Sequence, residues 1–89
     1  MKKSYRIRVY GRVQGVAYRY STKEIADSLS VTGYVKNMRD GSVYIEASGE
    51  QEYIEHFIRW CRKGPPMARV VNTEIEETDG ISQKRFSIR

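Results

Sequence analysis

Two segments with the periodicity of an amphipathic helix interrupt a chain that otherwise alternates between apolar and polar residues. The first segment repeats along one helical face through Thr22, Ile25, Ala26 and Leu29. The second repeats through Tyr53, Ile54, Phe57, Ile58 and Cys61, and the sequence Gly64-Pro65-Pro66 predicts where it ends. The predicted order of elements is therefore strand, helix, strand, strand, helix, strand.

The strand predictions rest on short stretches in which every second residue is apolar. They cover residues 4–13, 33–37 and 43–47, then Val71, Thr73 and Ile75, with Phe86 and Ile88 as a short edge strand after a turn at Asp79-Gly80. Asp40-Gly41 is a strong signal for a hairpin turn between the second and third strands. Residues 33–47 are therefore predicted to form a β-hairpin.

This element order predicts an α+β fold of the ferredoxin-like type, a βαββαβ sandwich with an antiparallel sheet. Each helix must cross the sheet between strands, and right-handed crossovers place both helices on one face. The polar side chains of Arg6, Arg8, Tyr44 and Glu46 are then expected to line the uncovered face. Because a chain of 89 residues has room for one core, we expect residues 1–89 to form a single domain.

Lysine and arginine outnumber aspartate and glutamate by 16 to 11, which gives a formal net charge of +5. This excess favours an anionic partner, but it is also common in soluble proteins, and composition alone leaves both explanations open. The single cysteine, Cys61, excludes an internal disulfide and a multi-cysteine metal cage. No stretch has the length of a membrane span or the pattern of a secretory signal. We therefore expect no membrane association and a reducing, cytoplasmic location.

The stretch GRVQGVAYR, residues 11–19, connects the first predicted strand to the first predicted helix. Free N–H groups at the start of a helix carry partial positive charge, and glycines let a loop aim successive amides at one anion. Arg19 would add a planar fork suited to phosphate oxygens. The alternative is a plain turn with a surface arginine, and these residues alone do not exclude it. The G-x-x-x-x-G-K-[ST] and G-x-G-x-x-G patterns are absent, so ATP is not a predicted ligand.

Two details near this loop also remain open from the residues alone. The first helix has two predicted starts, because Ser21 and Glu24 fit a capping box while the pattern equally allows a start near Tyr18. Asn37 ends a strand before the hairpin, where its amide would either satisfy the turn or hold a water near the loop. His56 is predicted at the surface or its boundary, and Cys61 is predicted as a core thiol.

Three separated segments carry a family resemblance. They are GRVQGVAYR (residues 11–19), VTGYVKNMRDGSVYIEASGE (residues 31–50) and GPPMARV (residues 64–70). In this order and spacing they closely resemble the acylphosphatase family, from about Tyr5 to Val71 with a compatible tail. The departures are mild: Tyr18 and Tyr34 stand where the family usually has Phe and Trp, Ser30 where Gly is usual, and Tyr44 where Glu is common.

The resemblance implies an enzyme that hydrolyses the mixed anhydride of a carboxylic acid and phosphate, with the ferredoxin-like fold. It places phosphoryl binding on the loop amides of Gln14, Gly15, Val16, Ala17 and Tyr18 and on the side chain of Arg19. It places the positioning of the attacking water on Asn37. It implies a small acyl phosphate as the partner, with no metal and no cofactor, and nothing in the chain requires more than a monomer.

Two other functions compete with this expectation. A basic sheet face bearing tyrosines would suit single-stranded RNA, but the third strand, GSVYIEASG, lacks the RNP1 pattern of RNA-recognition domains. Nucleic-acid binding is therefore not expected. The other alternative is an acylphosphatase-like domain that serves regulation or carbamoyl transfer within a larger machine. The absence of an appended segment favours a free-standing enzyme.

Overall fold

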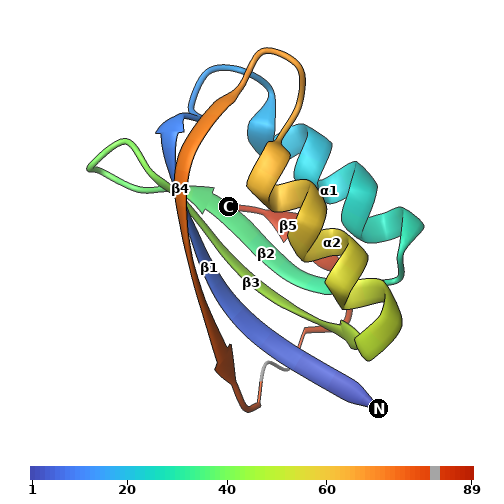
Figure 1. Cartoon of the computed structure of the whole chain (residues 1–89). Helices are drawn as coiled ribbons and strands as arrows, with labels where there is room; N and C mark the ends of the chain where they lie inside the picture. The colour runs from blue at the N-terminus through green and yellow to red at the C-terminus, as the bar shows by residue number, and fades with distance from the viewer. Residues whose placement is uncertain (81–82) are drawn as a thin grey trace.

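In the computed structural model, which describes residues 1–80 and 83–89, two helices lie against one face of a five-stranded sheet (Figure 1). The strands are β1 (Lys2–Arg12), β2 (Thr32–Asn37), β3 (Val43–Glu50), β4 (Arg69–Thr78) and β5 (Phe86–Ile88). The helices are α1 (Tyr18–Ser28) and α2 (Gln51–Lys63). The strand order across the sheet is β4-β1-β3-β2-β5, which confirms the predicted ferredoxin-like α+β fold.

The prediction of a wholly antiparallel sheet is wrong at one edge, because β5 pairs with β2 in parallel. The register explains the direction of β5. Thr78, the last residue of β4, pairs with Ser4, which pairs with Ser48, and Ser48 pairs with Thr32 at the start of β2. The chain therefore leaves β4 at the end of the sheet where β2 begins. A strand that starts at that end and pairs with β2 runs parallel to it.

Helix α1 begins at Tyr18, the earlier of its two predicted starts. The residue before it, Ala17, has a φ of 64°, and its carbonyl accepts the first helical bond from Ser21 N–H at 3.0 Å. No side chain caps this helix, so the capping-box alternative is wrong. A capping serine must lie outside the helix, whereas Ser21 lies inside its first turn.

Helix α1 ends in a left-handed turn at Ser30, whose φ is 55°. The N–H of Val31 donates to the carbonyl of Ala26 at 2.8 Å, and the N–H of Ser30 donates to that of Asp27 at 3.3 Å. These two bonds form a Schellman motif, which usually has glycine at the left-handed position. The departure at Ser30 noted from the sequence therefore falls on a residue with a strained backbone.

Two apolar residues that the sequence pattern places on buried faces are exposed in the structure. Val71 is 70% exposed, while its neighbour Val70 packs against the core. The register between β1 and β4 shifts between Tyr10 and Gly11, and Val71 is the residue left without a partner across this bulge. Tyr53, predicted on the apolar face of α2, is 46% exposed.

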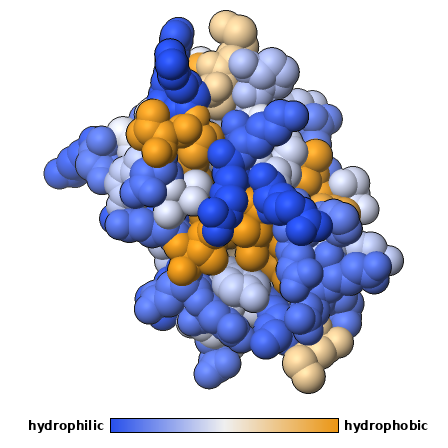
Figure 2. Space-filling view, viewed as in Figure 1, coloured by the Kyte–Doolittle hydropathy of each residue, from blue (hydrophilic) through white to orange (hydrophobic). Residues whose placement is uncertain are grey.

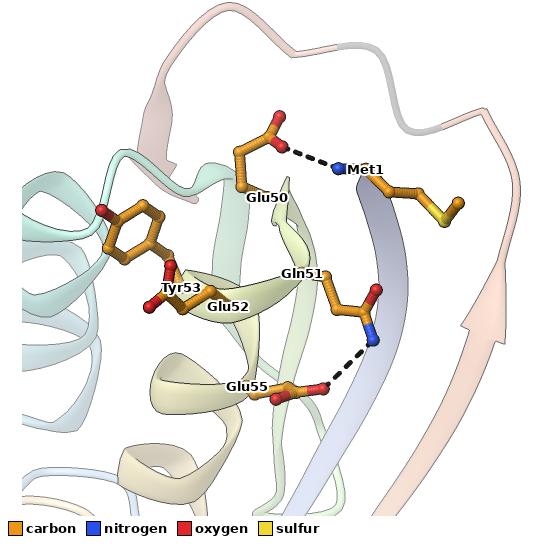
Figure 3. Close-up of a pocket in the computed structure, with 6 residues that line it drawn as sticks. All are labelled: Met1, Glu50, Gln51, Glu52, Tyr53 and Glu55. Atoms are coloured by element: carbon orange, nitrogen blue, oxygen red, sulfur yellow. Dashed lines mark hydrogen bonds and ion pairs between the residues drawn. The ribbon is translucent and has the colours of Figure 1, made fainter.

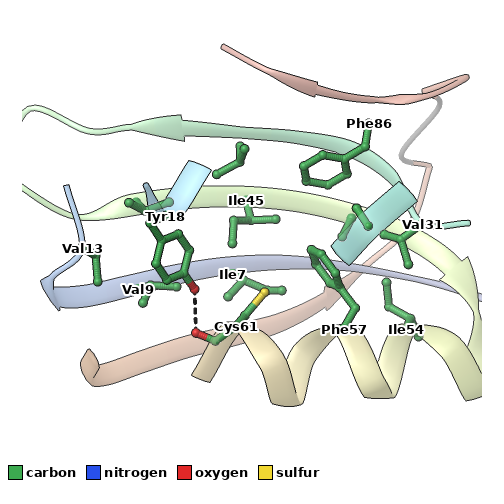
Figure 4. Close-up of a cluster of buried hydrophobic side chains, with 14 of the residues drawn as sticks. Ile7, Val9, Val13, Tyr18, Val31, Ile45, Ile54, Phe57, Cys61 and Phe86 are labelled. Atoms are coloured by element: carbon green, nitrogen blue, oxygen red, sulfur yellow. Dashed lines mark hydrogen bonds between the residues drawn. The ribbon is translucent and has the colours of Figure 1, made fainter. Parts of the chain in front are cut away.

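The core lies between the sheet and the two helices (Figure 4). Fully buried side chains come from every layer, among them Ile7 of β1, Phe57 of α2 and Phe86 of β5. The Cys61 thiol is completely buried here, and burial raises its pKa, so it remains a protonated core thiol as predicted. The outer surface is mostly hydrophilic, with apolar side chains in small separate groups in the view of Figure 2.

Candidate functional site

The residues 11–19 loop and the end of β2 meet at one end of the sheet. Asn37, the last residue of β2, pairs with Val43, and Val43 pairs with Val9 near the end of β1. The loop that follows β1 therefore begins close to Asn37. Between them is a hollow of about 180 Å³, lined by Val13, Gly15, Ala17, Arg19, Tyr20, Asn37 and Ile88. The two residues expected to carry catalysis, Arg19 and Asn37, thus line the same small hollow.

The backbone of the loop is held in a conformation that leaves amides free. Gly15 has a φ of 75° and Ala17 a φ of 64°, both in the left-handed region. Among the described residues, no main-chain N–H of residues 14–20 donates a hydrogen bond to another protein group. Some of these belong to the first turn of α1, whose N–H groups have no helical acceptor and carry partial positive charge. A loop with alternating backbone conformations and free amides is suited to binding an anion.

Arg19 lies in the first turn of α1 and is partly exposed. Its Nη1 donates to the main-chain oxygen of Arg89 at 3.3 Å. Arg89 is itself held, because its N–H donates to Val35 at 2.8 Å and its guanidinium stacks 4.0 Å from the ring centroid of Tyr34. Within the described part of the chain no carboxylate side chain pairs with Arg19. Its guanidinium therefore keeps donors available for an anion.

The side-chain oxygen of Asn37, Oδ1, is buried and has no hydrogen-bond partner among residues 1–80 and 83–89. A buried polar atom without a partner costs free energy, and such atoms are rare in native proteins. The amide of Asn37 is therefore not accounted for by satisfying the hairpin turn, which was its alternative role. Asn37 also lines the hollow, so its side-chain amide lies beside the space that a small polar molecule would occupy.

The predicted phosphate-binding residues divide into three groups. Gly15, Ala17 and Arg19 line the hollow. The side chains of Val16 and Tyr18 are buried in the core, so these residues have only their main-chain N–H groups to offer. Gln14 contributes its side chain elsewhere, because its Nε2 donates to main-chain oxygens of the β2–β3 turn.

The sequence did not identify Tyr20, Ile88 or Arg89 as parts of the site. Tyr20 is 62% exposed and Ile88 40% exposed, and both line the hollow. The position of Tyr20 next to Arg19 could have indicated its place. Ile88 and Arg89 lie far from the loop in sequence, and only the pairing of β5 with β2 brings them there.

A larger hollow of about 550 Å³ lies elsewhere, at the start of α2 (Figure 3). It is lined by Met1, Glu50, Gln51, Glu52, Tyr53 and Glu55. The terminal ammonium of Met1 pairs with Glu50 at 3.0 Å. Three carboxylates against one ammonium give this hollow a charge that opposes phosphate, so size alone does not make it the candidate site.

Within residues 1–80 and 83–89, no group of three or more His, Cys, Asp or Glu side chains is placed to hold a metal ion. None of the described helices combines the length and apolar character needed to cross a membrane.

The fold and the hollow define a small ferredoxin-like α+β protein whose glycine loop, arginine and asparagine meet at a site sized for a small anion. The model of the family described as Acylphosphatase matches residues 5–88. The chain belongs to the acylphosphatase family, which makes it a hydrolase.

The relatives agree over nearly the whole chain. An acylphosphatase of Thermotoga maritima is 47% identical over 87 residues, covering 98% of this chain and 97% of its own length. The crystal structure of an acylphosphatase from Bacillus subtilis superposes with a TM-score of 0.94 at 38% identity, covering 100% of this chain and 99% of that one. HypF of T. kodakarensis also matches, with a TM-score of 0.84 at 36% identity over 98% of this chain, but only 12% of HypF is covered.

Proposed function

We propose that this chain hydrolyses the carboxyl–phosphate bond of acyl phosphates, with Arg19 and the loop amides holding the phosphoryl group and Asn37 positioning the attacking water. The observation that carries this assignment is the convergence of Arg19 and Asn37 on one hollow whose loop has free N–H groups. Membership in the acylphosphatase family supports the reaction class.

The chemistry requires little beyond these groups. The oxygen of water forms a bond to phosphorus, the bond from phosphorus to the acyl oxygen breaks, and its electron pair leaves on the carboxylate. The protons of the water end on inorganic phosphate and in solvent. The transition state is loose, with charge on the equatorial phosphoryl oxygens, so catalysis is mostly positioning and charge stabilisation. The loop amides and the fork of Arg19 supply charge stabilisation, and Asn37 supplies positioning.

We further propose that the reaction needs neither a metal ion nor a cofactor. A carboxylate is a stable leaving group, so its departure does not require a general acid or a metal to neutralise it. Preorganised N–H donors and one guanidinium supply the positive charge that a metal would otherwise provide.

We also propose that the active unit is a cytoplasmic monomer acting on a small molecule. The proposed roles fall on Arg19, Asn37 and the loop amides, so the mechanism calls for no residue from a second copy. A single buried cysteine without a partner suits a reducing compartment. The small Thermotoga relative, of which this chain covers 97%, favours an independent enzyme over a part of a larger machine such as HypF.

The test is phosphate release from benzoyl phosphate by the whole protein, with and without a chelator, and from p-nitrophenyl phosphate for comparison. We expect activity on the acyl phosphate alone, unchanged by chelation. Removing a preorganised donor to a developing charge costs about 10²–10³ in rate, so Arg19→Ala should lose at least that factor. Arg62→Ala, which removes an exposed arginine of α2, is the matched control and should keep full activity.

Two outcomes would count against the proposal. Near-wild-type turnover by Arg19→Ala would remove Arg19 from the mechanism. Tight binding of single-stranded RNA without any hydrolysis of benzoyl phosphate would favour the RNA-binding alternative.

A further inference from the structure

We propose that the side chain of Gln14 is a positioning residue that ties the loop of residues 11–19 to the β2–β3 turn and so sets the distance between Asn37 and the loop amides. The inference rests on the proposed function, because it assigns Gln14 a task within that site. Its geometric part, the tie itself, can be tested without substrate.

The tie consists of two hydrogen bonds from one amide group. Nε2 of Gln14 donates to the main-chain oxygen of Met38 at 2.8 Å and to that of Ser42 at 2.9 Å. A glutamine amide nitrogen carries two hydrogens, and both are used here. The side chain is partly buried, so these bonds are shielded from competing water.

The two acceptors belong to a turn that is already held together. Met38 N–H donates to Ser42 O at 2.8 Å, and Gly41 N–H donates to Met38 O at 3.1 Å. Asp40 Oδ1 accepts from the Ser42 N–H at 2.9 Å and from its hydroxyl at 2.5 Å. The turn is therefore cross-linked internally by these bonds, and Gln14 bonds to the main-chain oxygens of Met38 and Ser42 within it.

Asn37 depends on this turn for its position. It directly precedes Met38, and its own Oδ1 makes no hydrogen bond to the described part of the chain that would fix the side chain. Gln14 lies between Val13, which is buried, and Gly15, which is exposed, within the loop that offers the amides. One side chain thus connects the half of the site that holds phosphate to the half that positions water. A displacement of about 1 Å at a reacting group can cost about 10²-fold in rate.

The variant Gln14→Met keeps a similar length and volume but has no donor. We expect kcat for benzoyl phosphate to fall about 10- to 100-fold, while inhibition by inorganic phosphate changes less than about threefold, because Arg19 and the amides still hold the phosphoryl group. Gln51→Met, at the exposed start of α2, is the control and should leave both values unchanged.

The variant Gln14→Glu adds a pH signature. An ionised carboxylate has no hydrogen to donate and faces two carbonyl oxygens, whereas the protonated acid donates one hydrogen bond. Its activity relative to wild type should therefore rise as the pH falls toward the pKa of the new carboxyl. A role limited to stability would lower Tm without this relative change in the folded enzyme.

Hydrogen exchange separates the failure of this inference from the failure of the proposed function. If Gln14 ties the turn, exchange of the Met38 N–H should speed up about tenfold or more in Gln14→Met, while that of Ile45 in the middle of β3 stays as in wild type. Unchanged exchange at Met38, or unchanged kcat in an active enzyme, would overturn the inference. Faster Met38 exchange in Gln14→Met than in wild type, together with a wild-type protein that has no acylphosphatase activity, would instead sustain the tie and refute the function.

Discussion

Replacing Tyr18 by phenylalanine tests how the first turn of α1, and with it Arg19, is anchored. The hydroxyl of Tyr18 donates to the main-chain oxygen of Cys61 at 2.6 Å, as Figure 4 shows, and the ring is 1% exposed. Cys61 lies in the last turn of α2, where carbonyls have no helical partner. The variant keeps the ring but leaves a buried carbonyl unpaired, which costs about 1–3 kcal/mol. In a chain of this size each kcal/mol lowers Tm by about 4–8 °C.

The assay is urea unfolding followed by circular dichroism, with a thermal melt alongside. Tyr53→Phe is the matched control, because Tyr53 is 46% exposed and its hydroxyl bonds to no group among the described residues. We expect Tyr53→Phe to match wild type and Tyr18→Phe to unfold at lower urea with an unchanged m-value. Turnover at 25 °C should be retained, since the ring still packs against Trp60 at 5.5 Å. Equal unfolding free energies for Tyr18→Phe and wild type would refute the anchoring role of this bond.

Three further predictions concern the loops. Ser30→Gly should raise the unfolding free energy by up to about 1 kcal/mol, because relief of the left-handed backbone outweighs the added freedom of the unfolded chain; a lower Tm would contradict this. Hydrogen bonds from the hydroxyl and then the N–H of Ser42 lower the pKa of Asp40 below its usual 3.8, so Asp40 stabilises the fold above that value. Urea unfolding should show Asp40→Ala less stable than wild type at pH 7, and the gap should close as the pH falls through the lowered pKa; a constant gap would count against it. Tyr20→Ala should raise KM for benzoyl phosphate about threefold or more and that for acetyl phosphate less, since the ring offers apolar contact beside the hollow; equal changes would exclude this contact.

The elements whose signal is local were predictable from the sequence. The alternation of β1 and β3, the Asp40-Gly41 turn and the end of α2 at Gly64 each follow from residues within a few positions of one another. The start of α1 was not settled in this way, because a capping box at Ser21 and Glu24 and a start near Tyr18 both fitted the sequence. What decided it is the burial of Tyr18 against α2, a contact between residues 43 positions apart.

In the candidate site too, local motifs were predictable and contacts between distant residues were not. Arg19 and Asn37 were expected from motifs, and strand register brings them together. The side-chain bonds of Gln14 to the β2–β3 turn and the contact of Arg19 with Arg89 span 24 to 70 positions. No spacing rule predicts such contacts, because they depend on how strands far apart in the sequence pair. The orientation of Val71 was missed for the same reason, since a bulge opposite Tyr10 and Gly11 changes the alternation.

The most direct test of the proposed mechanism is the steady-state turnover of benzoyl phosphate by Asn37→Ala, with inhibition by inorganic phosphate measured on the same preparation. Asn72→Ala, an exposed asparagine of β4, serves as the control. If Asn37 positions water while Arg19 and the loop amides bind phosphate, kcat should fall about 10²-fold or more, with phosphate inhibition within about threefold of wild type. Near-wild-type kcat in the folded Asn37→Ala protein would contradict the assignment.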